Sequence, residues 1–185
     1  MKATGIIRRV DDLGRLVIPK EIRRTMRIPE GTPLEIFTDS DDTVTLKKYS
    51  PVMELRTLAQ EYAEGLSDTM NCSVCICDND TVIAVHHAAK LDYLDKGITT
   101  SVAKLIWDKK AVLLSSVSNN SKPILLIDSD TNPLEYAAQA FAPILTNGDP
   151  IGCVIAFVKN GVTLNENALC GVKVTAALIA KHIMM

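Results

Sequence analysis

Arginine side chains are concentrated at the N-terminal end of this 185-residue chain. Residues 1–27 carry eight Lys or Arg against three Asp or Glu, although the whole chain has a net charge of -2. Guanidinium groups contact phosphate oxygens and guanine edges in a two-pronged geometry. The segment therefore predicts a polyanionic partner, and double-stranded DNA in particular. The candidate DNA-binding residues are Arg8, Arg9, Arg15, Lys20, Arg23, Arg24 and Arg27.

The elements that must position these side chains form a small ββαββ unit. Branched residues predict the first strands, Asp11, Asp12 and Gly14 predict a turn between them, and Pro19 favours a helix start. The expected elements are strands at 4–10 and 15–18, a helix at 19–27, and strands at 34–38 and 43–48.

The expected helix has two different faces. Ile22 and Met26 fall together on a helical wheel and are expected to face the core, with the basic residues opposite. Arg8 and Arg15 extend this basic surface from the two strands, and the turn aspartates are positioned to pair with one of them. The alternative is an ordinary solvated helix face.

Fifty residues bury too little apolar surface to be stable alone without a metal, disulfides or a partner subunit. This segment contains no Cys or His. Its first strand carries apolar side chains on both faces, Ile6 and Val10 on one and Ile7 on the other, which suits strands enclosed between two chains. We therefore expect residues 1–50 to form a dimer.

The rest of the chain predicts a second, mildly acidic domain. Residues 51–55 resemble a junction, and residues 56–185 an α+β domain with helices packed on an antiparallel sheet. Asn147-Gly148 is a strong signal for a hairpin. The expected elements are helices at 53–70, 99–109 and 165–184, strands at 73–77, 81–86, 136–146 and 151–158, and short apolar runs of uncertain state at 111–117 and 123–128.

The second domain has few residue patterns that are typical of a metal site or a catalytic site. Cys72 and Cys75 form a C-x-x-C pair near His86 and His87, so zinc is conceivable, but no second pair follows and buried thiols are favoured. There is no paired-carboxylate signature and no phosphate-binding glycine loop. We expect no metal site and no enzymatic activity. The absence of a long apolar run or an export signal predicts a cytoplasmic protein without membrane contact.

The stretches TGIIRRVDDLGRLVIPKEIRR, PLEIF and LKKY resemble the N-terminal domain of AbrB-type transition-state regulators over about fifty residues. The resemblance implies a swapped-hairpin β-barrel dimer, in which two chains interleave their hairpins and present arginines to DNA. By this resemblance, the DNA-contacting arginines of the family correspond to Arg8, Arg15, Arg23 and Arg24, and Arg9 and Arg27 are further candidates.

The NGDPIGCVIAF hairpin resembles strands of GAF-type sensor domains. This resemblance implies a pocket between sheet and helices for an unidentified small-molecule effector, with no other cofactor. The chain has no recognisable cyclic-nucleotide motif, so a cyclic nucleotide is not expected as the ligand. A purely structural dimerisation domain with a filled core is the alternative. The candidate ligand-binding residues are His86, His87, Tyr93, Thr99 and Ser101.

The pairing of an AbrB-type head with a GAF-type domain resembles a group of sporulation regulators. It implies a sequence-specific transcription regulator that activates and represses late sporulation genes, associated with the nucleoid in the forespore. The apolar stripes of the helices at 53–70 and 165–184 favour further association, with a tetramer expected. The alternative is a swapped-hairpin module that binds a protein, as an antitoxin or scaffold does, next to a metabolite-sensing domain with no promoter-specific role.

Overall fold

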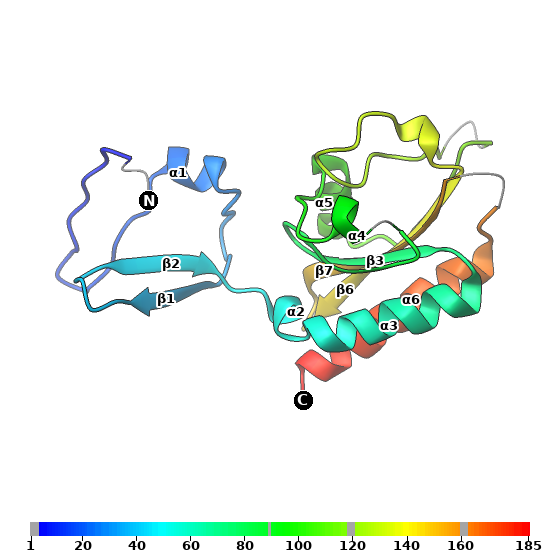
Figure 1. The fold of residues 1–185 in the computed structure, drawn as a ribbon. Helices are drawn as coiled ribbons and strands as arrows, with labels where there is room; N and C mark the ends of the chain where they lie inside the picture. The colour runs from blue at the N-terminus through cyan, green and yellow to red at the C-terminus, as the bar shows by residue number, and fades with distance from the viewer. Residues whose placement is uncertain (1–3, 89, 118–120, 160–162) are drawn as a thin grey trace. The chain divides into compact units, whose positions relative to one another are not determined.

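The computed structural model describes residues 4–88, 90–117, 121–159 and 163–185. The chain divides into two compact units, Met1–Tyr49 and Ser50–Met185, which are treated separately below (Figure 1). We call the first unit the head and the second unit the C-terminal unit.

The head contains one short helix and one β-hairpin. The helix α1 is Lys20–Thr25, and the strands β1, Leu34–Thr38, and β2, Val44–Lys48, pair antiparallel with Leu34 opposite Lys48. The strand expected at 34–38 is confirmed, and the one expected at 43–48 begins one residue later. The hairpin forms because β-branched and apolar residues flank a polar turn that contains Asp42 in the left-handed conformation.

The two strands expected at 4–10 and 15–18 are wrong for the single chain. Only their turn is present, closed by bonds from Asp11 N to Arg15 O (3.1 Å) and from Gly14 N to Asp11 O (3.0 Å). A strand needs a neighbouring strand to satisfy its backbone groups, and the described part of the chain provides none for these segments. Their apolar side chains are consequently exposed: Ile7 by 87%, and Leu13 and Val17 by 70% each.

The helix predicted at 19–27 is also shorter than expected, and its apolar side is not enclosed. Met26 follows α1 and is 51% exposed, whereas Ile22 is only half-buried. No residue described between 4 and 49 is fully buried. The head of one chain therefore has no core of its own.

The C-terminal unit is built on a five-stranded sheet of order β4-β3-β7-β6-β5, in which all neighbours are antiparallel. The central hairpin turns at Asn147 and Gly148, both with positive φ, as a two-residue hairpin loop requires. This expectation is confirmed. The strands are β3 Ser73–Asp78, β4 Val82–His86, β5 Val112–Ser115, β6 Ala138–Thr146 and β7 Asp149–Val158.

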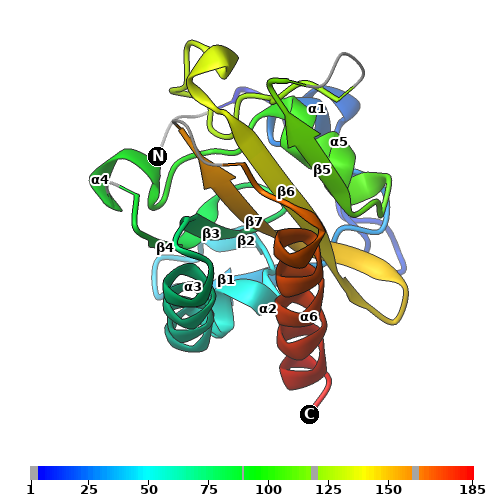
Figure 2. The ribbon, with the colours of Figure 1, turned by 90° about the vertical axis from the view of Figure 1, so that its right-hand side faces the viewer.

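Helices cover the two faces of this sheet unequally. The long helices α3 and α6 lie side by side on one face, whereas α5 and the segment 123–133 cover the other (Figures 1 and 2). Strand alternation explains the two cores, because Val74 and Ile76 point to the α3/α6 face and Cys75 and Cys77 to the α5 face. The helices are α2 Pro51–Glu54, α3 Arg56–Met70, α4 Lys90–Tyr93, α5 Thr100–Trp107 and α6 Glu166–Ile183, with a 3-10 turn at Pro133–Glu135.

Three segments differ from simple expectation. Residues 51–55 contain α2, which Ser50 caps by accepting a bond from Met53 N, and Val52 is fully buried in the core on the α3/α6 face. Residues 123–128, whose state the sequence left open, form no strand, and the short helix α4 lies between β4 and α5. Among the described residues, no helix is both long and apolar enough to span a bilayer.

Candidate nucleic-acid interface and effector pocket

The seven basic side chains predicted to contact DNA are all exposed in the head. Lys20, Arg23 and Arg24 belong to α1, Arg27 follows it, and the other three lie on the segment around the turn at Asp11. Because none of these residues is buried, each guanidinium or ammonium group can meet a phosphate without leaving a packed position. The head is therefore the polycationic part of an otherwise acidic chain.

Asp11 organises the turn and holds Arg15. Its Oδ1 accepts hydrogen bonds from Arg15 N (2.8 Å) and Leu13 N (3.1 Å), and its Oδ2 accepts one from Arg15 Nε (2.8 Å). The bonds from the Arg15 backbone and side chain lower the pKa of Asp11. The expectation that a turn aspartate pairs with one of the strand arginines is thus confirmed for Asp11 and Arg15.

The C-terminal end of α1 fixes the direction of the chain at Arg27. Ile28 N donates to Arg23 O (2.7 Å) and Arg27 N to Arg24 O (3.3 Å), the two bonds that end a helix in a Schellman motif. Arg27 has φ +50°, the left-handed conformation in which glycine is usually found. This conformation costs a residue other than glycine about 1–3 kcal/mol.

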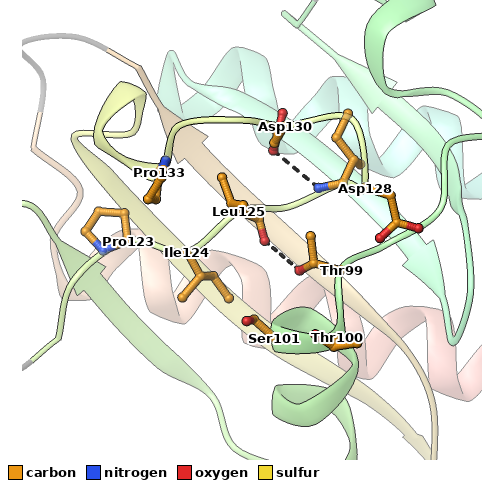
Figure 3. Close-up of a pocket in the computed structure, with 10 residues that line it drawn as sticks. Thr99, Thr100, Ser101, Pro123, Ile124, Leu125, Asp128, Asp130 and Pro133 are labelled. Carbon is orange, nitrogen blue, oxygen red and sulfur yellow. Dashed lines mark hydrogen bonds between the residues drawn. The ribbon is translucent and has the colours of Figure 1, made fainter.

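The C-terminal unit has a cavity of about 480 Å³ on the α5 face of its sheet (Figure 3). The first turn of α5 forms one wall, and the segment 123–133 forms the other. Thr99 joins them, because its Oγ1 accepts a bond from Val102 N (3.3 Å) and donates one to Leu125 O (2.7 Å). The lining residues are Thr99, Thr100, Ser101, Pro123, Ile124, Leu125, Ile127, Asp128, Asp130 and Pro133.

Two polar side chains, Gln139 and Asp130, hold the backbone of the wall at 123–130. The fully buried Gln139 of β6 donates from Nε2 to Ile124 O (2.7 Å), and its Oε1 accepts from Ile124 N (2.9 Å). Asp130 Oδ2 accepts from Leu126 N (2.9 Å) and Ile127 N (3.2 Å). The sequence prediction missed both anchors, although a glutamine inside the apolar strand AQAFAPIL is the signal that would have found one.

The five candidate ligand-binding residues fall in three different places. Thr99 and Ser101 line the cavity (Figure 3). Tyr93 is buried beside it in the core, where its hydroxyl is 3.0 Å from that of Tyr136, and does not line the cavity. Burial raises the pKa of Tyr93. His86 and His87 lie on the opposite face of the sheet near α3 and do not line this cavity.

Four of the five cysteines are packed in the cores, and Cys170 is exposed. Cys75, Cys77 and Cys153 are buried together on the α5 face, whereas Cys72 is buried on the α3/α6 face. Burial raises the pKa of Cys153 to about 12 and that of Cys72 to about 11. Because the thiolate is the metal-binding and nucleophilic form, these side chains behave as apolar core residues.

Similarity to known families identifies the chain. Residues 54–184 match a family model described as stage V sporulation protein T C-terminal, transcription factor. The chain belongs to the stage V sporulation protein T family. It is 47% identical to stage V sporulation protein T of Bacillus subtilis (strain 168) over 182 residues, which are 98% of each chain. The expectation of a sporulation transcription regulator is therefore confirmed.

The head of this sporulation protein has relatives of its own. The chain is 58% identical to the transition state regulatory protein AbrB of Bacillus subtilis (strain 168) over 66 residues, more than the head alone contains; the match covers 36% of this chain and 68% of that protein. Residues 7–53 also match a model described as antidote-toxin recognition MazE, bacterial antitoxin. The resemblance of the head to AbrB-type regulators is confirmed.

The C-terminal unit of this sporulation protein has the GAF fold. It is similar to the GAF domain of a phosphoenolpyruvate-protein phosphotransferase from Acinetobacter, with a TM-score of 0.57, 13% identity and coverage of 75% of this chain and 84% of that one. A methyl-accepting chemotaxis protein fragment is also similar, with a TM-score of 0.58, 19% identity and coverage of 71% and 90%. At these identities the likeness concerns the fold alone, and the predicted two-domain architecture is confirmed.

Proposed function

We propose that this chain binds promoter DNA sequence-specifically through residues 1–50 and is regulated through residues 56–185, with 51–55 as the junction. The observation that carries the proposal is the concentration of exposed basic residues in the head, the part similar to AbrB. Activation and repression of late sporulation genes follow from the family. A regulator of this kind acts in the cytoplasm at the nucleoid, here that of the forespore.

The DNA-binding form of the head is a dimer with interleaved hairpins. Support comes from the exposed apolar residues between 4 and 18, which have no partner strand in one chain, and from the lack of any buried residue described in the head. A second copy would supply the missing strands and bury Ile7, Leu13 and Val17. Val174 and Leu178, exposed on α6, support a further contact between C-terminal units that makes a tetramer.

Within the dimer, the contacts have different tasks. The arginines of α1 and those near the turn supply most of the affinity through phosphates, and some of them read base edges or groove shape. Asp11 holds Arg15 in a fixed orientation, which lowers the entropy lost on binding. Two copies of the basic residues in one dimer give a strong dependence of affinity on salt.

The C-terminal unit responds to a small molecule rather than catalysing a reaction. Its cavity is lined by five polar and five apolar residues, which suits a small polar ligand, and Thr99 and Ser101 are the candidate residues that line it. The family is one of transcription factors, and the buried cysteines have raised pKa values that disfavour nucleophilic chemistry. A regulatory, non-enzymatic role is therefore proposed.

The test is a gel shift with labelled fragments of late sporulation promoters and a scrambled fragment of equal length. The R23A/R24A variant should lose the shift on the promoter fragments, while size-exclusion chromatography shows an unchanged oligomer. In a salt titration, removing four arginines per dimer should lower the slope of log affinity against log salt by up to about 3.6, at about 0.9 per phosphate contact.

A matched variant separates the DNA contact from general charge. K104A/K110A also removes two exposed positive charges from each chain, but from the C-terminal unit. It should leave binding and the salt slope unchanged. If K104A/K110A weakens binding as much as R23A/R24A does, or if wild-type affinity hardly changes with salt, the head is not the DNA-binding surface.

The match of residues 7–53 to an antitoxin model supports one alternative, a head that binds an acidic protein. This alternative and DNA binding use the same exposed arginines. The gel shift distinguishes them, because a protein-binding head would give equal and weak shifts with promoter and scrambled fragments.

A further inference from the structure

Two histidines and an aspartate converge on the α3/α6 face of the C-terminal unit. His86 is the last residue of β4, His87 follows it, and Asp68 belongs to α3. One ligand atom from each, a nitrogen of each imidazole and a carboxylate oxygen, all lie within 4.8 Å of one another. His86 Nε2 is 3.5 Å and His87 Nε2 is 3.8 Å from the same oxygen, Asp68 Oδ1.

The backbone explains why two consecutive histidines face the same way. Neighbouring side chains in a strand point to opposite faces, and Val85 points to the core on the α5 face, so His86 points toward α3. His87 would then point away, but its φ of +58° turns the chain at this residue. The two rings are therefore stacked, with centroids 4.9 Å apart and planes inclined by 20°.

A carboxylate on α3 faces the other nitrogen of His86. Glu64 Oε1 is 3.9 Å from His86 Nδ1, and the same oxygen accepts a hydrogen bond from Gln60 Nε2 at 3.0 Å. Metal-binding histidines commonly present their second nitrogen to a carboxylate, which fixes the tautomer and the ring orientation. Glu64 is thus placed as a positioning residue that leaves His86 Nε2 directed toward Asp68.

We propose that Asp68, His86 and His87 bind a divalent transition-metal ion of the zinc class, with water in the remaining position. Two imidazoles and one carboxylate suit Zn²⁺ or Co²⁺, whereas Mg²⁺ and Ca²⁺ prefer sites made of oxygen atoms. All three side chains are partly exposed, so small rotations can bring their ligand atoms onto one ion. The ion links α3 to the end of β4, on the face of the sheet opposite the cavity.

The zinc site considered from the sequence combined cysteines with His86 and His87, whereas the site proposed here keeps the two histidines and replaces the cysteines by Asp68. Cys72, Cys75 and Cys77 are buried in the two cores, away from solvent. The two possibilities differ in a spectroscopic property. Cobalt bound to thiolates gives an intense sulfur-to-metal charge-transfer band, and cobalt bound to nitrogen and oxygen does not.

The test uses the tag-free full chain, titrated with ZnCl₂ by calorimetry and with CoCl₂ by absorption spectroscopy. We expect one equivalent of Zn²⁺, no competition by MgCl₂, and cobalt spectra without the thiolate band. D68N, H86Q and H87N should each weaken zinc binding by about tenfold or more, and E64Q by at least about tenfold through the orientation of His86. Asparagine is chosen at position 87 because it tolerates the left-handed backbone.

The chain offers a matched control in its third histidine. His182 lies on α6 next to Tyr62, outside the three-residue group, so H182Q should bind zinc as the wild type does. Circular dichroism establishes that each variant is folded. If a histidine variant unfolds, zinc binding by D68N still tests the proposal, because this change is isosteric and lies at an exposed residue. Absence of binding by the wild type, an equal loss in H182Q, full binding by D68N, or a thiolate band would each overturn the proposal.

Discussion

Replacing glycine by alanine at two positions of the C-terminal unit should change stability in opposite directions. Gly152 lies in β7 between β3 and β6, and a Cβ there would be 2.2 Å from Cys77 O and 3.2 Å from Asp78 Cα. To remove this overlap between the new Cβ and Cys77 O, the backbones of β3 and β7 must separate by about 1 Å. Because overpacking costs about 1–3 kcal/mol and the obstacle is backbone, we expect G152A to lose about 3 kcal/mol.

Gly65 provides the matched control. It is exposed within α3, and a Cβ there would meet nothing within 4 Å. Alanine should therefore stabilise the helix by about 0.5–1 kcal/mol. Urea unfolding of the full chain, followed by the signal of the C-terminal unit, measures both as shifts of the midpoint at constant slope. Equal stability of G152A and wild type would refute the close approach of β3 and β7, and destabilisation by G65A of the same size would show that the loss in G152A is not specific to that approach.

Three further outcomes follow from single side chains. Arg27→Gly relieves the strain of an arginine in the left-handed conformation and removes one positive charge. The hydrogen of the Ile28 amide, which donates to Arg23 O, should therefore exchange with solvent about fivefold more slowly, while the affinity for DNA should fall. Thiol labelling should find one fast-reacting cysteine, Cys170, which Cys170→Ser removes, because the other four are buried. Thr99→Ala should cost about 1 kcal/mol in urea unfolding through loss of the α5 cap, and Thr99→Ser should restore most of it.

Elements whose structure depends on neighbouring residues were predictable from the sequence. The hairpin of β6 and β7 follows from Asn147-Gly148, and the start of α6 follows from Asn165, whose side chain accepts bonds from two backbone amides of the first turn. The candidate DNA-binding residues needed only composition and a helical wheel. Whether they touch DNA stays a prediction.

Elements that depend on distant residues were not predictable. The strands at 4–10 and 15–18 need a partner that one chain does not contain. The state of the apolar run at 123–128 stayed open in the sequence, because part of its backbone is bonded by Gln139 and Thr99, which are distant in sequence. The convergence of the two histidines on Asp68 depends on one backbone angle at His87, which a sequence pattern does not reveal.

The way in which the cavity wall is held suggests how a ligand could act on this protein. The sheet is held by continuous ladders of backbone bonds, whereas the wall at 123–130 is joined to its neighbours by two backbone bonds, Thr99 N to Leu126 O and Asp128 N to Gly97 O, and by the side chains of Thr99 and Gln139. A single hydrogen bond of this kind contributes about 1 kcal/mol net. A ligand can therefore exchange one or two of these bonds for its own contacts and move the wall, whereas the same binding energy would not separate two strands. Since Thr99 also caps α5, such a movement would reach that helix first.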